Sequence, residues 1–159
     1  MVERLGGPAS SQHILIADAT TGSRGMEISP RGSVYLRPDA DRFIAHTNHF
    51  LENKLVDEPP WLEGSPLRLS RARELCVGLR DEIALASAPE VAKLLRTCVF
   101  SDKVGAPQSI CCYAPRENSV MATLFNIVMQ FEKGKEPYAE VIVGQPDEGD
   151  TSPVIRMPW

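Results

Sequence analysis

The sequence predicts an α+β fold of antiparallel strands with two helices. Short β-favouring runs separated by turn residues occupy both ends of the chain, and helical spacing of apolar residues is confined to the middle. Strands that precede and follow a helical block, without strict alternation, are typical of α+β proteins. The expected order is four strands, two helices and three strands in a single domain of 159 residues.

The first 46 residues predict an antiparallel meander of four strands. The expected strands are QHILIADA at 12–19, RGMEIS at 24–29, SVYLR at 33–37 and DRFIAH at 41–46. Turn residues separate them, as in the TTGS run at 20–23. Residues 51–66 then lack a sustained period and contain three prolines, which predicts a surface loop.

Two helices are expected next. Residues 66–80, PLRLSRARELCVGLR, place leucines at helical spacing behind an initial proline, with the arginines on a solvated face. A second helix is expected over Pro89 to Cys98, with Ser87 or Ala88 near its start. The three later strands are expected in QSICCY at 108–113, MATLFNIVMQFE at 121–132 and PYAEVIVGQP at 137–146.

Composition and charge exclude several classes of function. A hydrophobic content of 43% with 24% charged residues is ordinary for folded globular proteins. A net charge of -4, with scattered Lys and Arg, gives no basic surface for nucleic acid or anionic membranes. No apolar run approaches the roughly 20 residues of a membrane span, and no secretory signal opens the chain. We therefore expect a cytoplasmic protein with no nucleic-acid or membrane partner.

The four cysteines indicate buried thiols rather than a metal site or a disulfide framework. Cys76, Cys98, Cys111 and Cys112 show no paired spacing, and we expect them to be reduced. Cys111 and Cys112 lie in a strand pattern, so one of them should pack inertly in the core. Ser65 follows a glycine in a proline-rich stretch, which predicts a turn rather than a nucleophile. We expect neither a cofactor nor a metal.

The stretch FIAHTNHFLEN at 43–53 holds two of the three histidines in the chain. His46 and His49 could share a zinc ion with His13 or with a cysteine, although the set lacks a recognisable spacing. A structural turn, in which Thr47 and Asn48 bond the local backbone, is a second interpretation. A catalytic role is a third, and the residues alone leave these alternatives open.

Several short motifs occur in an order and spacing that resemble one family. They are HTNHF at 46–50, SIC at 109–111, ATLFNIVM at 122–129 and VGQP at 143–146, together with GG at 6–7 and MEISP at 26–30. The chain resembles the acyl-coenzyme A:6-aminopenicillanic-acid acyltransferases, which are cysteine-type N-terminal-nucleophile hydrolases. The resemblance covers about residues 5–146 and corresponds to the C-terminal portion of the family fold.

The resemblance implies an αββα sandwich, of which residues 1–159 form a partial domain. It implies chemistry on amide or thioester acyl groups by a cysteine freed by self-cleavage, with its own α-amino group as base. Asn48 corresponds to the asparagine that donates a hydrogen bond to the oxyanion. Substrate-binding roles follow by the same resemblance for His46, Thr47, His49, Phe50 and Ser119.

The sequence also departs from the family pattern. None of the four cysteines follows a glycine, and the family's nucleophile lies upstream of the segment that HTNHF matches. Val120 and Cys112 stand where the family has arginines. We therefore expect this chain alone to lack the nucleophile and to be inactive, acting on acyl-CoA or N-acyl small molecules only if an N-terminal half completes it.

Two alternatives to a catalytic fragment follow from these departures. The chain could be a non-catalytic remnant or subunit that binds acylated small molecules or docks onto a separately encoded half. It could also derive from a truncated gene model. A missing half-sandwich would leave an apolar sheet face exposed, so self-association is expected.

Overall fold

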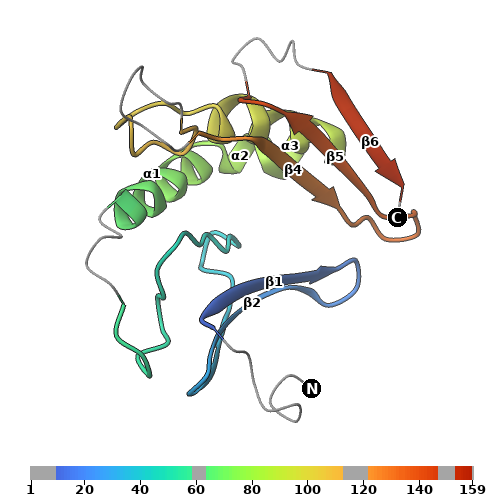
Figure 1. Cartoon of the computed structure of the whole chain (residues 1–159). Helices are drawn as coiled ribbons and strands as arrows, with labels where there is room; N and C mark the ends of the chain where they lie inside the picture. The colour runs from blue at the N-terminus through green and yellow to red at the C-terminus, as the bar shows by residue number, and fades with distance from the viewer. Residues whose placement is uncertain (1–9, 59–63, 113–121, 147–152, 159) are drawn as a thin grey trace. The chain divides into compact units, whose positions relative to one another are not determined.

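The computed structural model describes residues 10–58, 64–112, 122–146 and 153–158. The chain divides into two compact units, Met1–Leu69 and Ser70–Trp159. The described residues form two three-stranded antiparallel sheets, one in each unit, together with helices (Figure 1). The predicted α+β class with antiparallel strands is confirmed at this level, and the single partial domain stays a prediction.

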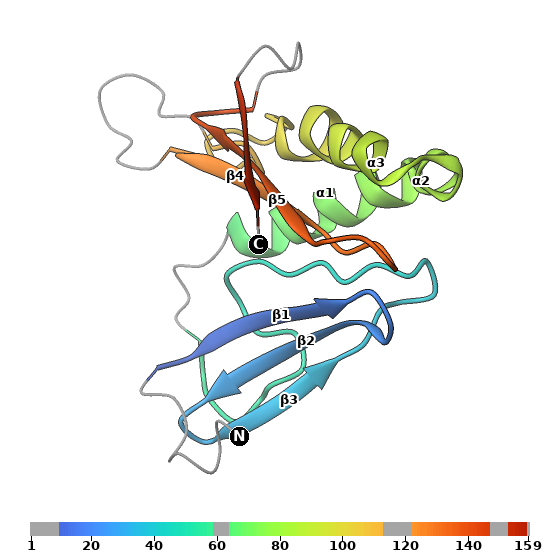
Figure 2. The same ribbon diagram turned by 90° about the vertical axis from the view of Figure 1, so that its right-hand side faces the viewer.

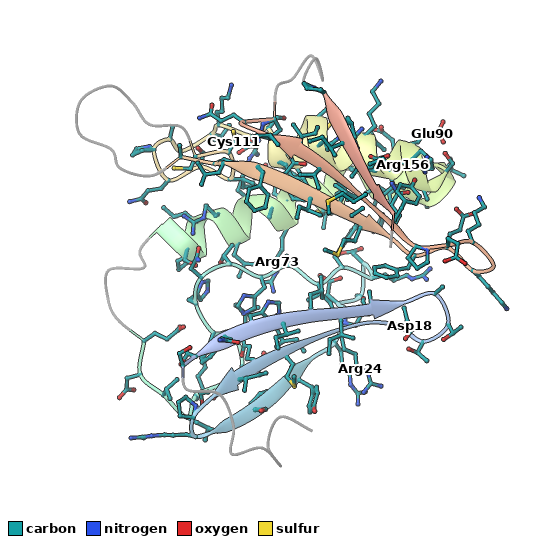
Figure 3. The ribbon with its side chains drawn as sticks, turned by 45° about the vertical axis from the view of Figure 1, so that its right-hand side comes forward. Asp18, Arg24, Arg73, Glu90, Cys111 and Arg156 are labelled. Atoms are coloured by element: carbon teal, nitrogen blue, oxygen red, sulfur yellow. The ribbon has the colours of Figure 1, made fainter. Side chains whose placement is uncertain are left out.

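The sheet of the first unit is a meander of three strands. These are β1 (Gln12–Asp18), β2 (Gly22–Ser29) and β3 (Gly32–Leu36), and each pairs with the next one in the chain (Figure 2). Asp18 closes the β1–β2 turn, where its Oδ1 accepts the backbone N–H groups of Thr20 and Thr21 at 2.6 Å each (Figure 3). The hydroxyl and N–H donors of these two threonines hold the pKa of Asp18 well below its usual range.

The predicted fourth strand, DRFIAH at 41–46, is wrong. Asp39 accepts the backbone N–H groups of Asp41 and Phe43 on its side chain, both at 3.0 Å. The Asp39 N–H in turn donates to the Phe43 carbonyl oxygen at 2.9 Å, and Arg42 has a positive φ of 67°. This local turn uses the backbone groups that a fourth strand would have needed for pairing.

Helices occupy residues 64–100. They are α1 (Gly64–Gly78), α2 (Arg80–Leu85) and α3 (Ala88–Leu94), and α3 continues into the π-helical turn η3 (Leu95–Phe100). Both predicted helices are confirmed in position, with α2 as a short addition. The Glu90 carboxylate accepts the backbone N–H and the hydroxyl of Ser87, each at 2.7 Å, which fixes the start of α3. No helix in the described ranges has the length and apolar character that a bilayer crossing demands.

The sheet of the second unit contains β4 (Phe125–Gln130), β5 (Tyr138–Val143) and β6 (Val154–Pro158) in that order. The first two strands confirm the predictions over 121–132 and 137–146. The β6 strand was not predicted from the sequence. Its Arg156 guanidinium lies over the Tyr138 ring of β5, 3.8 Å from the centroid, which ties the edge strand to its neighbour.

The predicted strand in QSICCY is wrong over its described part, residues 108–112, where residues 108–111 form bends and no strand is present. The Ser109 hydroxyl donates to the Cys111 carbonyl oxygen at 2.6 Å, and the Cys111 N–H donates to the Asp102 carbonyl oxygen at 2.8 Å. These short-range bonds replace a strand ladder. Tyr113, the last residue of the predicted strand, lies outside the described residues.

The two faces of the β4–β6 sheet differ in environment. One face buries Val128 and Ile142, and there Arg96 of η3 donates to the Glu140 carboxylate of β5. Both partners of this ion pair are largely buried, with side chains 8% and 15% exposed. The other face carries exposed apolar side chains at alternate positions of β4 and β6, namely Phe125, Ile127, Met129, Ile155 and Met157.

A polar pocket in the first unit

The HTNHF segment lines a polar pocket of about 370 Å³. Its wall contains three histidines, an asparagine and a carboxylate, and all lining residues belong to the first unit. They are Ser11, Gln12, His13, His46, Thr47, Asn48, His49, Phe50 and Glu58. Phe50 is buried and anchors the segment, whereas Asn48 is exposed at the pocket wall.

The side-chain amide of Asn48 is held in one orientation. Arg68, on the first turns of α1, donates from Nη2 to Oδ1 of Asn48. Because a guanidinium has only donors, it must meet the amide oxygen, and this contact identifies which end of the amide is Nδ2. Within the described residues Nδ2 has no protein acceptor, so its two N–H groups remain available at the pocket.

Ser65 joins the backbone of Asn48 to the His49 ring. Ser65 is 1% exposed, and its Oγ accepts the Asn48 backbone N–H at 2.7 Å. The Ser65 hydroxyl donates to Oγ1 of Thr47 at 2.9 Å, and Thr47 donates to the Ser65 carbonyl oxygen at 2.9 Å. Nδ1 of His49 lies 2.8 Å from the Ser65 oxygen. Since the Ser65 hydroxyl donates to Thr47, its oxygen is left to accept from Nδ1 of His49.

We expect Ser65→Ala to lower the free energy of unfolding by about 1–3 kcal/mol. The change removes the oxygen that accepts the Asn48 backbone N–H and contacts Nδ1 of His49. Ser70→Ala is the matched control on the same helix, where the exposed serine should cost no more than about 0.5 kcal/mol. Urea unfolding of both variants measures the difference. Equal free energies would show that the Ser65 network adds no stability.

Glu27 of β2 is fully buried beneath this segment, with 0% exposure. Its carboxylate accepts the backbone N–H groups of Leu51 at 2.5 Å, Glu52 at 3.0 Å and Asn53 at 2.7 Å. It also lies 2.8 Å from Nε2 of His46. Burial alone would raise the pKa of Glu27, but these donors outweigh burial and lower it, so the carboxylate is ionised.

The ring of His13, on β1, stacks on the ring of His46. The ring centroids are 3.6 Å apart and the planes are parallel to within 1°. The His13 ring also explains Gly25 on β2, because a Cβ there would lie 2.9 Å from Nε2 of His13. Burial lowers the pKa of His13, the neighbouring His46 lowers it further, and Glu27 opposes the shift.

The lowered pKa of His13 predicts that acid destabilises the first unit. The folded state disfavours protonated His13. The contribution of His13 to the free energy of unfolding is therefore fully present above its unfolded pKa of about 6.5, and it is lost as the pH falls through its folded pKa. We expect the wild type to lose stability below pH 6.5, and His13→Phe to lose less over the same range. Urea unfolding from pH 7.5 to 5 measures this, and parallel curves for the two proteins would contradict it.

The structure brings most of the predicted site residues together. His46, Thr47, Asn48, His49 and Phe50 all line the pocket. Ser119 lies outside the described residues. The residues that hold this segment, which are Glu27, Ser65 and Arg68, were not predicted from the sequence to do so. The turn predicted at Ser65 is wrong, because Ser65 lies in the first turn of α1.

A shared zinc ion does not fit the contacts of the two histidines. Nδ1 of His46 lies 2.6 Å from the Thr47 carbonyl oxygen and Nε2 faces Glu27, so neither nitrogen is directed at a common ligand position with His49. Among the residues that the structure describes, no group of three His, Cys, Asp or Glu side chains could hold a metal.

The cysteines do not contribute to the pocket wall. Cys111 is fully buried, as predicted for one member of the adjacent pair, and burial raises the pKa of its thiol (Figure 3). A thiol with a raised pKa is a poor nucleophile. Cys112 is half-buried, and its Sγ donates to the Pro107 carbonyl oxygen at 3.3 Å.

The described elements define an α+β protein whose first unit carries a polar pocket beside the HTNHF segment. The chain belongs to the acyl-coenzyme A:6-aminopenicillanic acid acyl-transferase family, whose family model matches residues 4–148. The span expected from the motifs, about 5–146, agrees closely with this match. Family membership supports an acyltransferase-like function. No curated protein matches the chain.

Proposed function

We propose that this chain contributes the oxyanion-stabilising part of an N-terminal-nucleophile acyltransferase or amidohydrolase. In this proposal Asn48 donates from Nδ2 to the oxygen of an amide or thioester carbonyl as negative charge develops on it. The observation that carries the proposal is the contact from Arg68 to Oδ1, which leaves the donor end of the amide for the pocket.

The nucleophile in this scheme is a cysteine outside residues 1–159. The cysteine's own α-amino group takes the thiol proton, the thiolate attacks the carbonyl carbon, and the π electrons move to oxygen. The tetrahedral intermediate then collapses with loss of an amine or of the CoA thiol, which takes the proton back from that α-ammonium group. The acyl group then passes from sulfur to an acceptor amine or to water. The absence of any Gly-Cys pair from the sequence, and the raised pKa of Cys111, support a nucleophile supplied from elsewhere.

The fold that suits this scheme is the αββα sandwich, with residues 1–159 as its C-terminal part. The substrate-facing roles of Thr47, His49 and Phe50 are part of the same proposal, and so is that of Ser119, which lies outside the described residues. Acyl-CoA or an N-acyl small molecule is the proposed substrate.

Complementation tests the proposal. The purified chain alone should not turn over acyl-CoA thioesters or N-acyl amines, and co-expression with the N-terminal half of a family member should produce turnover. An N-terminal half whose nucleophilic cysteine is changed to alanine is the matched control. Turnover by the chain alone that survives Asn48→Ala would contradict the assignment of Asn48.

A non-catalytic subunit is the second candidate function. The observation that favours it is the exposed apolar face of the β4–β6 sheet, where Phe125 is 55% exposed and Met129 is 51% exposed. Exposed apolar areas of this kind favour association with another polypeptide. Analytical ultracentrifugation of the purified chain should show self-association, and a monomer at all concentrations would count against this function.

A further inference from the structure

The peptide group that leads into Asn48 is fixed at both of its ends. Nδ1 of His46 lies 2.6 Å from the Thr47 carbonyl oxygen, and the Asn48 N–H donates to Oγ of Ser65 at 2.7 Å. The carbonyl and the N–H belong to the same planar peptide unit, so these two contacts set its orientation. That orientation fixes the N–Cα bond of Asn48, about which its side chain is placed.

Both ring nitrogens of His46 face oxygen atoms. Nδ1 faces the Thr47 carbonyl oxygen, and Nε2 faces the ionised Glu27 carboxylate. Both of these oxygen atoms can only accept hydrogen bonds. Nε2 of His46 and the Glu27 carboxylate therefore form a buried contact at 2.8 Å. The exposed fractions of the two side chains are 7% and 0%.

The Glu27 carboxylate binds the chain on both sides of Asn48, at a side chain before it and at backbone N–H groups after it. It binds His46, two residues before Asn48, and it accepts the N–H groups of residues 51–53, three to five residues after it. The Asn53 side chain also donates to the Glu27 carbonyl oxygen at 3.3 Å. One buried strand residue thus spans the whole HTNHF segment.

We propose that Glu27 and His46 are positioning residues, and that their buried contact orients the Asn48 amide toward the pocket while neither residue contacts substrate. This gives His46 a positioning role in place of the substrate contact that the family resemblance implied. The expected effect on turnover rests on the proposed function, whereas the positioning of Asn48 does not.

Amide hydrogen exchange tests the positioning directly, with no need for activity. His46→Phe keeps an aromatic ring in the stack with His13 but removes both ring nitrogens, and His13→Phe is the matched control on the other ring. We expect exchange at the Asn48 backbone amide to accelerate about tenfold or more in His46→Phe, the order of one lost hydrogen bond, and to stay within about threefold in His13→Phe. Protection at Ile28 in β2 reports whether the sheet stays intact.

If amide exchange at Ile28 is also faster in His46→Phe, the sheet is disturbed and His46→Gln replaces that variant. Exchange at the Asn48 amide is again expected to accelerate about tenfold or more. In the complemented enzyme the positioning variant should lower kcat about tenfold or more with KM within about twofold, since only the aim of the donor changes. Unchanged exchange at Asn48 would overturn the proposal, as would faster exchange with an unchanged kcat. If the complemented wild type shows no turnover, the proposed function fails, and the exchange comparison still decides whether Glu27 and His46 fix the Asn48 peptide.

Discussion

The Asn48→Ala variant is expected to lose about 100- to 1,000-fold in kcat in the complemented enzyme, the usual consequence of removing one oxyanion donor. Arg68 holds Oδ1 of Asn48, so Nδ2 is the end directed at a substrate carbonyl. KM should change little, because the hydrogen bond strengthens only as charge develops on the oxygen. Steady-state kinetics on an acyl-CoA thioester measure both quantities.

Gln108→Ala is the control for Asn48→Ala, because it removes an exposed side-chain amide from a loop of the second unit. It should leave kcat unchanged. A fall in kcat of less than about threefold in Asn48→Ala would be too small for an oxyanion donor and would contradict the assigned role.

Glu140→Ala is expected to lower the free energy of unfolding by about 3–5 kcal/mol, because it removes the carboxylate that faces a buried guanidinium. Arg96 is 7% exposed, so water cannot fully replace the lost partner. The pair joins η3 to β5, and the loss should therefore appear in the second unit. Urea unfolding followed by circular dichroism measures it.

Glu132→Ala provides the contrast. Glu132 pairs with Lys135 at 2.6 Å on the surface, where both side chains are substantially exposed, and such pairs contribute at most about 1 kcal/mol. Similar losses in Glu140→Ala and Glu132→Ala would show that burial does not strengthen the Arg96 pair.

Most of the regular structure could be predicted from local pattern. Strands β1 to β3 follow from short β-favouring runs separated by turn residues, and α3 begins where Ser87 and Glu90 form a capping pair. The failures have local causes as well. The strands expected at 41–46 and 108–112 are absent because the side chains of Asp39 and Ser109 form hydrogen bonds with the local backbone, which favours turns over strand pairing.

The candidate site was predictable only in part. The motif HTNHF identified the segment that lines the pocket, because its residues are contiguous in the sequence. The residues that support the segment come from elsewhere in the chain: Glu27 lies 24–26 residues before the N–H groups it binds, and Ser65 lies 17 residues after Asn48. The burial of Glu27 could not be predicted, because a glutamate between Met26 and Ile28 in an alternating strand is the usual pattern of a solvent-facing position.

The most direct test of the account is whether the Asn48 amide binds a negatively charged acyl oxygen. A short-chain carboxylate, the product of acyl-group hydrolysis, is titrated into the ¹⁵N-labelled chain, and the side-chain amide signals of asparagine are followed, with Asn48→Ala assigning the resonance. We predict that the Nδ2 protons of Asn48 shift downfield in a saturable manner, while those of the buried Asn53 do not move. An Asn48 amide signal that stays unchanged at saturating carboxylate, or binding of equal affinity in Asn48→Ala, would contradict the account.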